Sequence, residues 1–189
     1  ILTPEKMSAL INNTKNIKHR AVLHTIYHNG LRISELLNLT LMDIKSKCDN
    51  PHLIIRNSKN NKSRIILITS ESLDLLQFYY RQYKPKYWLF EGEKENIKYS
   101  KTSVSRILQK ACKREKITER LRVHDLRHNF ATHALASGTN IHHLAKHLGH
   151  SSVRTTESTY AHLLPEQIQI LRPTLKTDSK VVNFGRIAG

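Results

Sequence analysis

The sequence predicts a mainly α-helical fold with a small antiparallel β-sheet at its side, which places it in the α+β class. Three observations lead to this prediction. Helix start and stop signals recur along most of the chain, two β-branched runs flank a polar turn, and 189 residues are enough to bury the core of one domain. The sequence contains no internal repeat and no low-complexity tract. The individual elements follow from these signals in chain order.

The first part of the chain predicts three helices. Residues 3–5, Thr-Pro-Glu, are typical of a helix start, with a hydroxyl cap, a proline in the first turn and an acid facing the helix dipole. A second helix is expected from about residue 16 to residue 28, and Gly30 ends it. A short helix is expected within residues 31–39, and its inward-facing side chains are Ile33, Leu36 and Leu37.

The clearest strand signal is HLIIRNSKNNKSRIILI, residues 52–68. Its two β-branched runs flank a turn of Asn, Lys and Ser, and this pattern predicts a β-hairpin. Residues 87–90 predict a further short strand. The small sheet of the predicted fold is therefore expected around this hairpin.

The remaining elements are expected to be helices, followed by a tail. The expected helices cover residues 70–83, 100–114, 124–136 and 141–148, with a last helix after Pro165. Hydroxyl side chains cap the first two, at Ser70 and Ser100, and glycines end the next two, at Gly138 and Gly149. We therefore predict a folded domain over residues 1–172 and a polar tail over residues 173–189.

The charge balance narrows the class of partner. Lysines and arginines number 31 against 15 acidic residues, for a formal net charge of +16, which favours a polyanion. An acidic membrane fits less well, because no apolar stretch could span a bilayer and no basic amphipathic helix stands apart. Cys48 and Cys112 lie far apart without a CxxC motif, as expected in a reducing cytoplasm. Nucleic acid is the favoured partner.

Basic residues and one tyrosine recur in an order that suits phosphoryl transfer; the set is Arg32, Lys59, His124, Arg127, His150 and Tyr160. Two arginines can bracket the oxygens of a phosphate in its transition state, a lysine can protonate the leaving oxygen, and a histidine can accept the nucleophile's proton. A tyrosine with a pKa near 10 is ionised in about one molecule per thousand at pH 7, an activation cost of about 4 kcal/mol. A cationic pocket would supply this activation.

Three stretches carry a resemblance to a known family: GLRISELLNL (30–39), HDLRHNFATHALASG (124–138) and LGHSSVRTTESTYAHL (148–163). In this order and spacing they resemble the catalytic domain of the tyrosine recombinase (phage integrase) family. The resemblance covers nearly the whole chain, from residue 2 to about Leu171. It implies the tyrosine recombinase catalytic-domain fold, site-specific recombination or integration of DNA through a covalent 3′-phosphotyrosine, and no metal or nucleotide cofactor.

The resemblance also implies a role for each residue of the set. Arg32 and Arg127 match the two phosphate clamps, and His124 matches the proton-transfer partner of the nucleophile. His150 matches a His/Trp position that hydrogen-bonds the phosphate, and Tyr160 matches the nucleophile. Lys59 matches the hairpin lysine that acts as general acid. Glu35 is expected to be structural and to buttress a basic neighbour.

Two departures from the family pattern bear on these roles. The family often has Gly-Lys-Gly at the hairpin turn, where this chain has Ser-Lys-Asn at residues 58–60, so Lys62 remains an alternative to Lys59. Tyr160 follows His150 by ten positions, whereas nine is common in relatives. The linking residues 151–159 are mostly small and hydroxylated. We therefore expect Tyr160 to be out of line or poorly ordered without DNA, while Arg32, His124, Arg127 and His150 converge.

The family further implies double-stranded DNA as partner, a homo-oligomer on DNA with a tetrameric synapse, and a monomer without DNA. Its members commonly carry an N-terminal core-binding domain, which is absent from this chain, and the tail packs on a neighbouring protomer or folds back in cis. The expected location is the cytoplasm, on the bacterial nucleoid when DNA is bound.

Other functions remain open. A type IB topoisomerase uses similar chemistry, and a non-catalytic DNA-binding module could keep the same fold. His143, His147 and His150 have a spacing compatible with metal ligands, but no nearby acid completes the set and Gly149 interrupts the helix, so we expect no metal.

Overall fold

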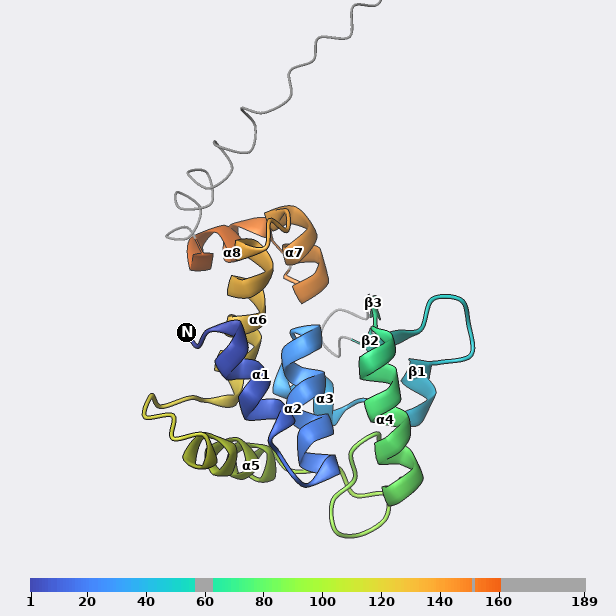
Figure 1. Cartoon of the computed structure of the whole chain (residues 1–189). Helices are drawn as coiled ribbons and strands as arrows, with labels where there is room; N and C mark the ends of the chain where they lie inside the picture. The colour runs from blue at the N-terminus through green and yellow to red at the C-terminus, as the bar shows by residue number, and fades with distance from the viewer. Residues whose placement is uncertain (57–62, 151, 161–189) are drawn as a thin grey trace, which may run out of the picture.

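The computed structural model describes residues 1–56, 63–150 and 152–160. Within these ranges the chain forms eight α-helices, one 3-10 helix and a three-stranded antiparallel sheet, which confirms the predicted α+β class. Figure 1 shows the sheet and α4 to one side of the other helices, with α7 and α8 together at one end. No helix in the described ranges is long and apolar enough to cross a membrane.

The first helices are α1 (Pro4–Asn12), α2 (Ile17–Asn29) and α3 (Ile33–Leu37), followed by the 3-10 helix η1 (Leu41–Asp43). Thr3 caps α1 as the sequence predicts. Gly30 ends α2 with a φ of 58°, a left-handed conformation that favours glycine. A Cβ at this position would also lie 2.5 Å from Cδ1 of Phe130, so the close packing of α2 against α6 requires glycine here.

The sheet confirms the predicted hairpin. Its strands are β1 (Ile44–Lys45), β2 (His52–Arg56) and β3 (Ser63–Leu67), in the order β1-β2-β3. Leu53 pairs with Ile66, and Ile55 pairs with Arg64. Leu53, Ile55 and Ile66 are buried, because alternate residues of each strand face the helical core. The hairpin turn itself, residues 57–62, lies outside the described residues.

The later helices are α4 (Ser70–Tyr83), α5 (Lys101–Arg114), α6 (Val123–Ala136), α7 (Ile141–Leu148) and α8 (Val153–Tyr160). The predicted cap of α4 is wrong by one residue, since Oγ1 of Thr69, and not Ser70, accepts the N–H of Ser72. Ser100 caps α5 and Gly149 ends α7, as predicted. The helix expected after Pro165 and the tail at residues 173–189 lie outside the described residues.

The predicted strand over residues 87–90 is wrong. This segment makes only one isolated bridge, between Thr40 and Trp88. The carboxylate of Glu91 accepts the backbone N–H groups of Lys86 and Tyr87, at 3.0 and 2.9 Å. These two bonds bend the chain before a strand can extend, which explains the difference.

Two apolar clusters hold the helices together. The larger one surrounds α2, and includes residues of α1, α4, α5 and the sheet. The smaller one lies between α6, α7 and α8, and consists of Ala131, Leu135, Leu144, Leu148 and Tyr160. α6 contributes to both clusters, so this helix joins the body of the domain to the α7–α8 end.

Candidate active site

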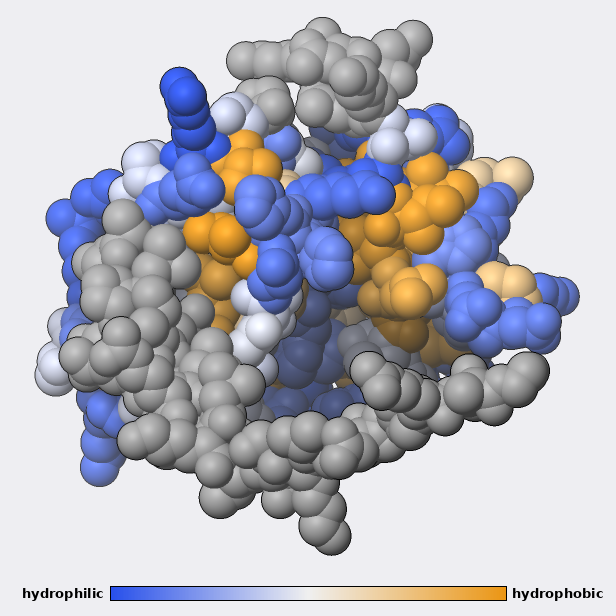
Figure 2. Space-filling model, turned by 90° about the horizontal axis from the view of Figure 1, so that it is seen from above, coloured by the Kyte–Doolittle hydropathy of each residue, from blue (hydrophilic) through white to orange (hydrophobic). Residues whose placement is uncertain are grey.

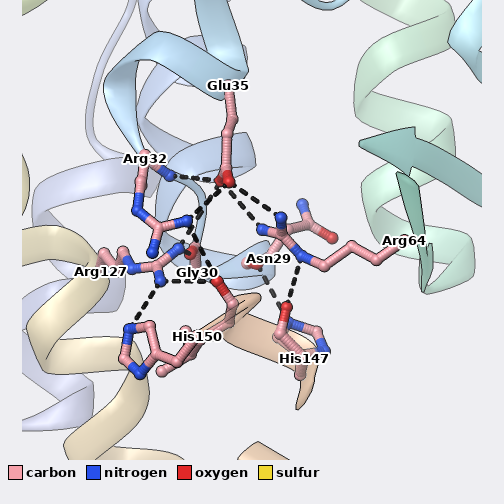
Figure 3. Close-up of polar contacts among 9 residues, drawn as sticks. Asn29, Gly30, Arg32, Glu35, Arg64, Arg127, His147 and His150 are labelled. Atoms are coloured by element: carbon pink, nitrogen blue, oxygen red, sulfur yellow. Dashed lines mark hydrogen bonds and ion pairs between the residues drawn. The ribbon is translucent and has the colours of Figure 1, made fainter. Parts of the chain in front are cut away.

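Glu35 lies among three arginines from different elements, Arg32, Arg64 and Arg127, which we call the arginine cluster (Figure 3). Its carboxylate accepts one hydrogen bond from the Arg32 guanidinium at 3.0 Å and two from Arg64 at 2.8 and 2.9 Å. Nη1 of Arg127 is 3.6 Å from the same carboxylate. The side chain of Glu35 is only 9% exposed, so one buried acid partly neutralises the cluster.

Glu35 also determines how α3 begins. Its Oε2 accepts the backbone N–H of Arg32 at 2.8 Å, as a carboxylate in the first turn of a helix commonly does. Burial alone would raise the pKa of Glu35. The hydrogen bonds from Arg64 and from the Arg32 backbone, with the charges of Arg64 and Arg127, outweigh burial and hold this pKa below its usual value. The buried carboxylate is therefore charged at neutral pH, which supports the expected structural role of Glu35.

Arg127 is held by the ends of two helices. It donates to the carbonyl of Gly30 after α2 and to the carbonyl of Leu148 at the end of α7, both at 2.7 Å. Carbonyls at helix C-termini lack intrahelical partners and carry partial negative charge, so they suit a buried cation. Burial, and then the neighbouring charge of Arg32, lower the pKa of Arg127 to about 10, which leaves it charged at neutral pH. Its side chain is 4% exposed.

Arg64 reaches the same place from β3. Its Nε donates to the carbonyl of His147 at 2.6 Å, while its two terminal nitrogens hold Glu35. The side chain of Arg64 is 14% exposed, against 40% for Arg32. Arg32 is thus the member of the cluster whose guanidinium is most open to a ligand. Figure 2, seen from the α7–α8 end, shows hydrophilic side chains between two hydrophobic areas.

His150 follows α7 and contacts Arg127. Its Nε2 lies 3.1 Å from Nη2 of Arg127, and its Nδ1 lies 2.7 Å from Oγ1 of Thr156. A guanidinium can only donate, so Nε2 accepts, and the neutral ring then carries its proton on Nδ1 and donates to Thr156. Burial, followed by the charges of Arg127 and Arg32, lowers the pKa of His150 to about 4. The ring is therefore neutral at pH 7 in this state.

Tyr160 is the last residue of α8 and is only 4% exposed. Its hydroxyl lies 3.0 Å from Nδ1 of His128, and the two rings stack with their centroids 5.0 Å apart. Burial raises the pKa of Tyr160, although the charge of Arg127 acts in the opposite direction. The expected loosely held segment is instead a helix from Val153, because Thr156 and Tyr160 lie four residues apart on one helical face and are both buried. A poorly ordered Tyr160 does not fit this helix, whereas the other alternative, a Tyr160 that is out of line without DNA, stays a prediction.

The structure brings together Arg32, Arg127 and His150, three of the residues that the sequence singles out. His124 is exposed on the first turn of α6, one helical turn before Arg127. Lys59 and the alternative Lys62 lie outside the described residues. In the described ranges, no group of three or more His, Cys, Asp or Glu residues could hold a metal ion.

Sequence reasoning missed Arg64 and the contact between His128 and Tyr160. Arg64 is one of 31 lysines and arginines, and no local signal separates it from the others. The sequence places His128 directly after Arg127, but its contact with Tyr160 joins residues 32 positions apart and gives no local signal. Both contacts depend on tertiary packing.

Comparison with known proteins identifies the class. The profile of the phage integrase family matches residues 1–167, and the chain therefore belongs to this family. It is 32% identical over 169 residues to a tyrosine recombinase of Thermosipho africanus, which covers 88% of this chain and 58% of that protein. It is 33% identical over 164 residues to the tyrosine recombinase XerA of Saccharolobus solfataricus, which covers 87% and 52%. The chain spans between 50% and 61% of the length of such relatives.

Solved structures confirm the predicted fold. The crystal structure of XerA recombinase superposes with a TM-score of 0.80 at 24% identity, over 94% of this chain and 65% of that chain. The XerH site-specific recombinase bound to its difH substrate gives a TM-score of 0.75 at 19% identity, over 82% and 49%. The catalytic domain of bacteriophage HP1 integrase gives 0.64 at 22% identity, over 98% of both chains. The chain has the tyrosine recombinase catalytic-domain fold.

Proposed function

We propose that this chain is the catalytic domain of a site-specific DNA recombinase or integrase, which cleaves and rejoins strands through a covalent 3′-phosphotyrosine. The observation that carries the proposal is the arginine cluster, where Arg32 and Arg127 converge beside His150. The place beside Arg32, Arg127 and His150, which we call the phosphate pocket, would offer a phosphate two positive groups, of which Arg127 is already fixed by helix carbonyls. Donors fixed in advance stabilise developing charge without reorganisation.

In this proposal each residue has one role in the strand-cleavage step. The hydroxyl oxygen of Tyr160 attacks the scissile phosphorus and forms a bond to it. The bond between this phosphorus and the 5′-oxygen of the next nucleotide breaks. Arg32 and Arg127 bind the non-bridging oxygens. His150 hydrogen-bonds the same phosphate, and His124 accepts the proton of the tyrosine.

Lys59, or Lys62 in its place, protonates the leaving 5′-oxygen. Both residues belong to the hairpin between β2 and β3, and Arg64 of β3 connects that hairpin directly to Glu35 and His147. This connection supports the role, because it fixes the base of the hairpin beside the phosphate pocket.

His150 must change its hydrogen bonding when phosphate binds. In the DNA-free protein its Nε2 accepts from Arg127, whereas a phosphate oxygen requires a donor. Thr156 makes this exchange possible, because its hydroxyl can accept from Nδ1–H or, after rotation, donate to an unprotonated Nδ1. The ring can then present Nε2–H to the phosphate without a change of net charge.

Double-stranded DNA is the proposed substrate, and the net charge of +16 supports it. A homo-oligomer on DNA, with a tetrameric synapse, and a monomer in its absence are the proposed assembly states. The cytoplasm, on the nucleoid when DNA is bound, is the proposed location. The described cysteines, Cys48 and Cys112, are both free, which suits that compartment.

The decisive experiment uses a DNA substrate nicked near the scissile phosphate, so that the covalent adduct is trapped. The wild-type chain should form an adduct, and mass spectrometry should map it to Tyr160. Tyr160→Phe removes only the hydroxyl and should abolish the adduct while DNA affinity stays within about twofold. An adduct that persists in Tyr160→Phe, or maps to another residue, contradicts the assignment.

A second assay separates a recombinase from a topoisomerase. Both enzymes can relax supercoiled DNA, so relaxation alone does not distinguish them. Recombination between two cognate sites on one plasmid is expected only of the recombinase. Relaxation without any recombinant product would instead favour the topoisomerase.

A further inference from the structure

The contact between His128 and Tyr160 has no part in the proposed strand-cleavage step. Nδ1 of His128 lies 3.0 Å from the tyrosine hydroxyl. The rings are nearly parallel, with an interplanar angle of 24° and centroids 5.0 Å apart. The hydroxyl of Tyr160, the proposed nucleophile, is therefore already in contact with His128 in the DNA-free protein.

The direction of this contact follows from helix geometry. Arg127 and His128 are consecutive residues of α6, and successive side chains leave an α-helix about 100° apart. Arg127 points to the helix ends at Gly30 and Leu148 and to His150. His128 points to α8 and Tyr160. The hydroxyl is thus held on the face of α6 next to the arginine cluster.

The surroundings of Tyr160 give this hydrogen bond its weight. The tyrosine ring packs with Ala131, Leu135, Leu144 and Leu148 in the smaller apolar cluster. A buried hydroxyl that loses its partner in such surroundings is unfavourable, so the contact with His128 stabilises this placement. α8 is held separately at Thr156, whose hydroxyl contacts Nδ1 of His150. The hydroxyls of Tyr160 and Thr156 thus have different partners, so loss of the contact between Tyr160 and His128 does not require loss of the contact between Thr156 and His150.

We propose that His128 is a positioning residue for Tyr160: its Nδ1 accepts the hydroxyl hydrogen bond and holds the nucleophile beside the phosphate pocket until DNA is bound. This inference rests on the proposed role of Tyr160 as nucleophile. Attack requires the hydroxyl to leave His128 and to turn to the phosphate. Only molecules in which the Tyr160 hydroxyl has left His128 can react, so this hydrogen bond lowers the observed cleavage rate.

The test compares variants that keep or remove the acceptor. His128→Phe keeps a ring that can stack on Tyr160 but cannot accept a hydrogen bond, and His128→Asn keeps an acceptor oxygen near the position of Nδ1. Single-turnover adduct formation on the nicked substrate, at saturating protein, should be about fivefold faster in His128→Phe, as expected for one neutral hydrogen bond of about 1 kcal/mol. His128→Asn should react at nearly the wild-type rate.

Tyr27 of α2 supplies a matched control, because its partner His133 lies on α6, the same helix as His128. Its hydroxyl lies 2.7 Å from Nδ1 of His133, so Tyr27→Phe removes a similar tyrosine–histidine hydrogen bond away from the arginine cluster. This variant should leave the rate of adduct formation unchanged. An equal acceleration in Tyr27→Phe would mean that general loosening of α6 explains the effect, and would overturn the proposal.

The other outcomes are equally decisive. Slower cleavage in His128→Phe would mean that His128 assists the attack, and an unchanged rate would mean that it does not hold the tyrosine; either result overturns the proposal.

A measurement on the unmodified chain tests the same contact without any variant. Nitrogen-15 shifts of His128 without DNA should show a hydrogen-bonded, unprotonated Nδ1, and a proton on Nδ1 contradicts the proposal. Absence of any wild-type adduct would contradict the proposed function, while the nitrogen shifts would still test the contact.

Discussion

The arginine cluster and the Tyr160 end of α8 are held in place in different ways. The cluster is tied to the backbone, since Arg127 binds the carbonyls of Gly30 and Leu148 and Arg64 binds that of His147. Tyr160 rests on its hydrogen bond to His128 and on packing with four other buried residues. The cluster joins α2, α3, α6, α7 and the sheet, whereas Tyr160, within the described residues, packs with side chains of α6 and α7.

This difference assigns a separate physical task to each region. Stabilisation of a charged transition state depends on donors that do not reorganise, so a network anchored in several elements suits the phosphate pocket. A nucleophile that has to move must be held by contacts that can be exchanged, and Tyr160 is held by one side-chain hydrogen bond and by apolar packing. Substitutions within the arginine cluster and at its junction with α8 should therefore have separable effects on stability and on cleavage.

The largest effect is expected for Glu35→Gln. Loss of this buried charge leaves three arginines without their common partner, and removal of one member of a buried ion pair costs about 4 kcal/mol of unfolding free energy. Urea denaturation at neutral pH measures the change. Glu95→Gln, at an exposed position, is the control and should change stability by less than about 0.5 kcal/mol. A comparable loss in both variants would show that Glu35 does not organise the cluster.

Arg127→Ala is expected to affect chemistry more than DNA binding. Loss of one positioned donor in the transition state should slow adduct formation about a hundredfold, or about 3 kcal/mol. Non-specific affinity should change much less, because the chain carries 31 lysines and arginines. Arg154→Ala, at an exposed position of α8, should leave the cleavage rate within about twofold. If binding and cleavage fell in parallel in Arg127→Ala, the clamp role would be wrong.

The smallest effect is expected at the junction of the two regions, in Thr156→Val. Thr156 is fully buried, and valine keeps its shape but loses the hydroxyl that contacts Nδ1 of His150. The loss of one hydrogen bond should lower the unfolding free energy by about 1 kcal/mol and slow cleavage about fivefold. Thr155→Val, on the exposed side of the same helix, is the control. Faster cleavage in Thr156→Val would mean that this contact restrains His150.

Much of the secondary structure was predictable because its signals are local. Thr3 and Ser100 cap helices through their own side chains, and Gly30 and Gly149 end helices through a backbone conformation that favours glycine. The hairpin followed from two β-branched runs on either side of a polar turn. The strand prediction for residues 87–90 was wrong because the carboxylate of Glu91 accepts the backbone N–H groups of Lys86 and Tyr87, which a strand would need for pairing.

The sequence by itself determined the family, through the order of its motifs, and the basic character, through its composition. It also singled out Arg32, Arg127, His150 and Tyr160 as candidate site residues. These features depend only on residue identity and spacing, so they can be recognised without the folded structure. Only the tertiary structure decided that Arg64 joins Glu35 from 29 positions away, and that the Tyr160 hydroxyl meets His128. Such contacts depend on how helices pack and on the angular phase of each side chain, and neither quantity can be read from a local stretch of sequence.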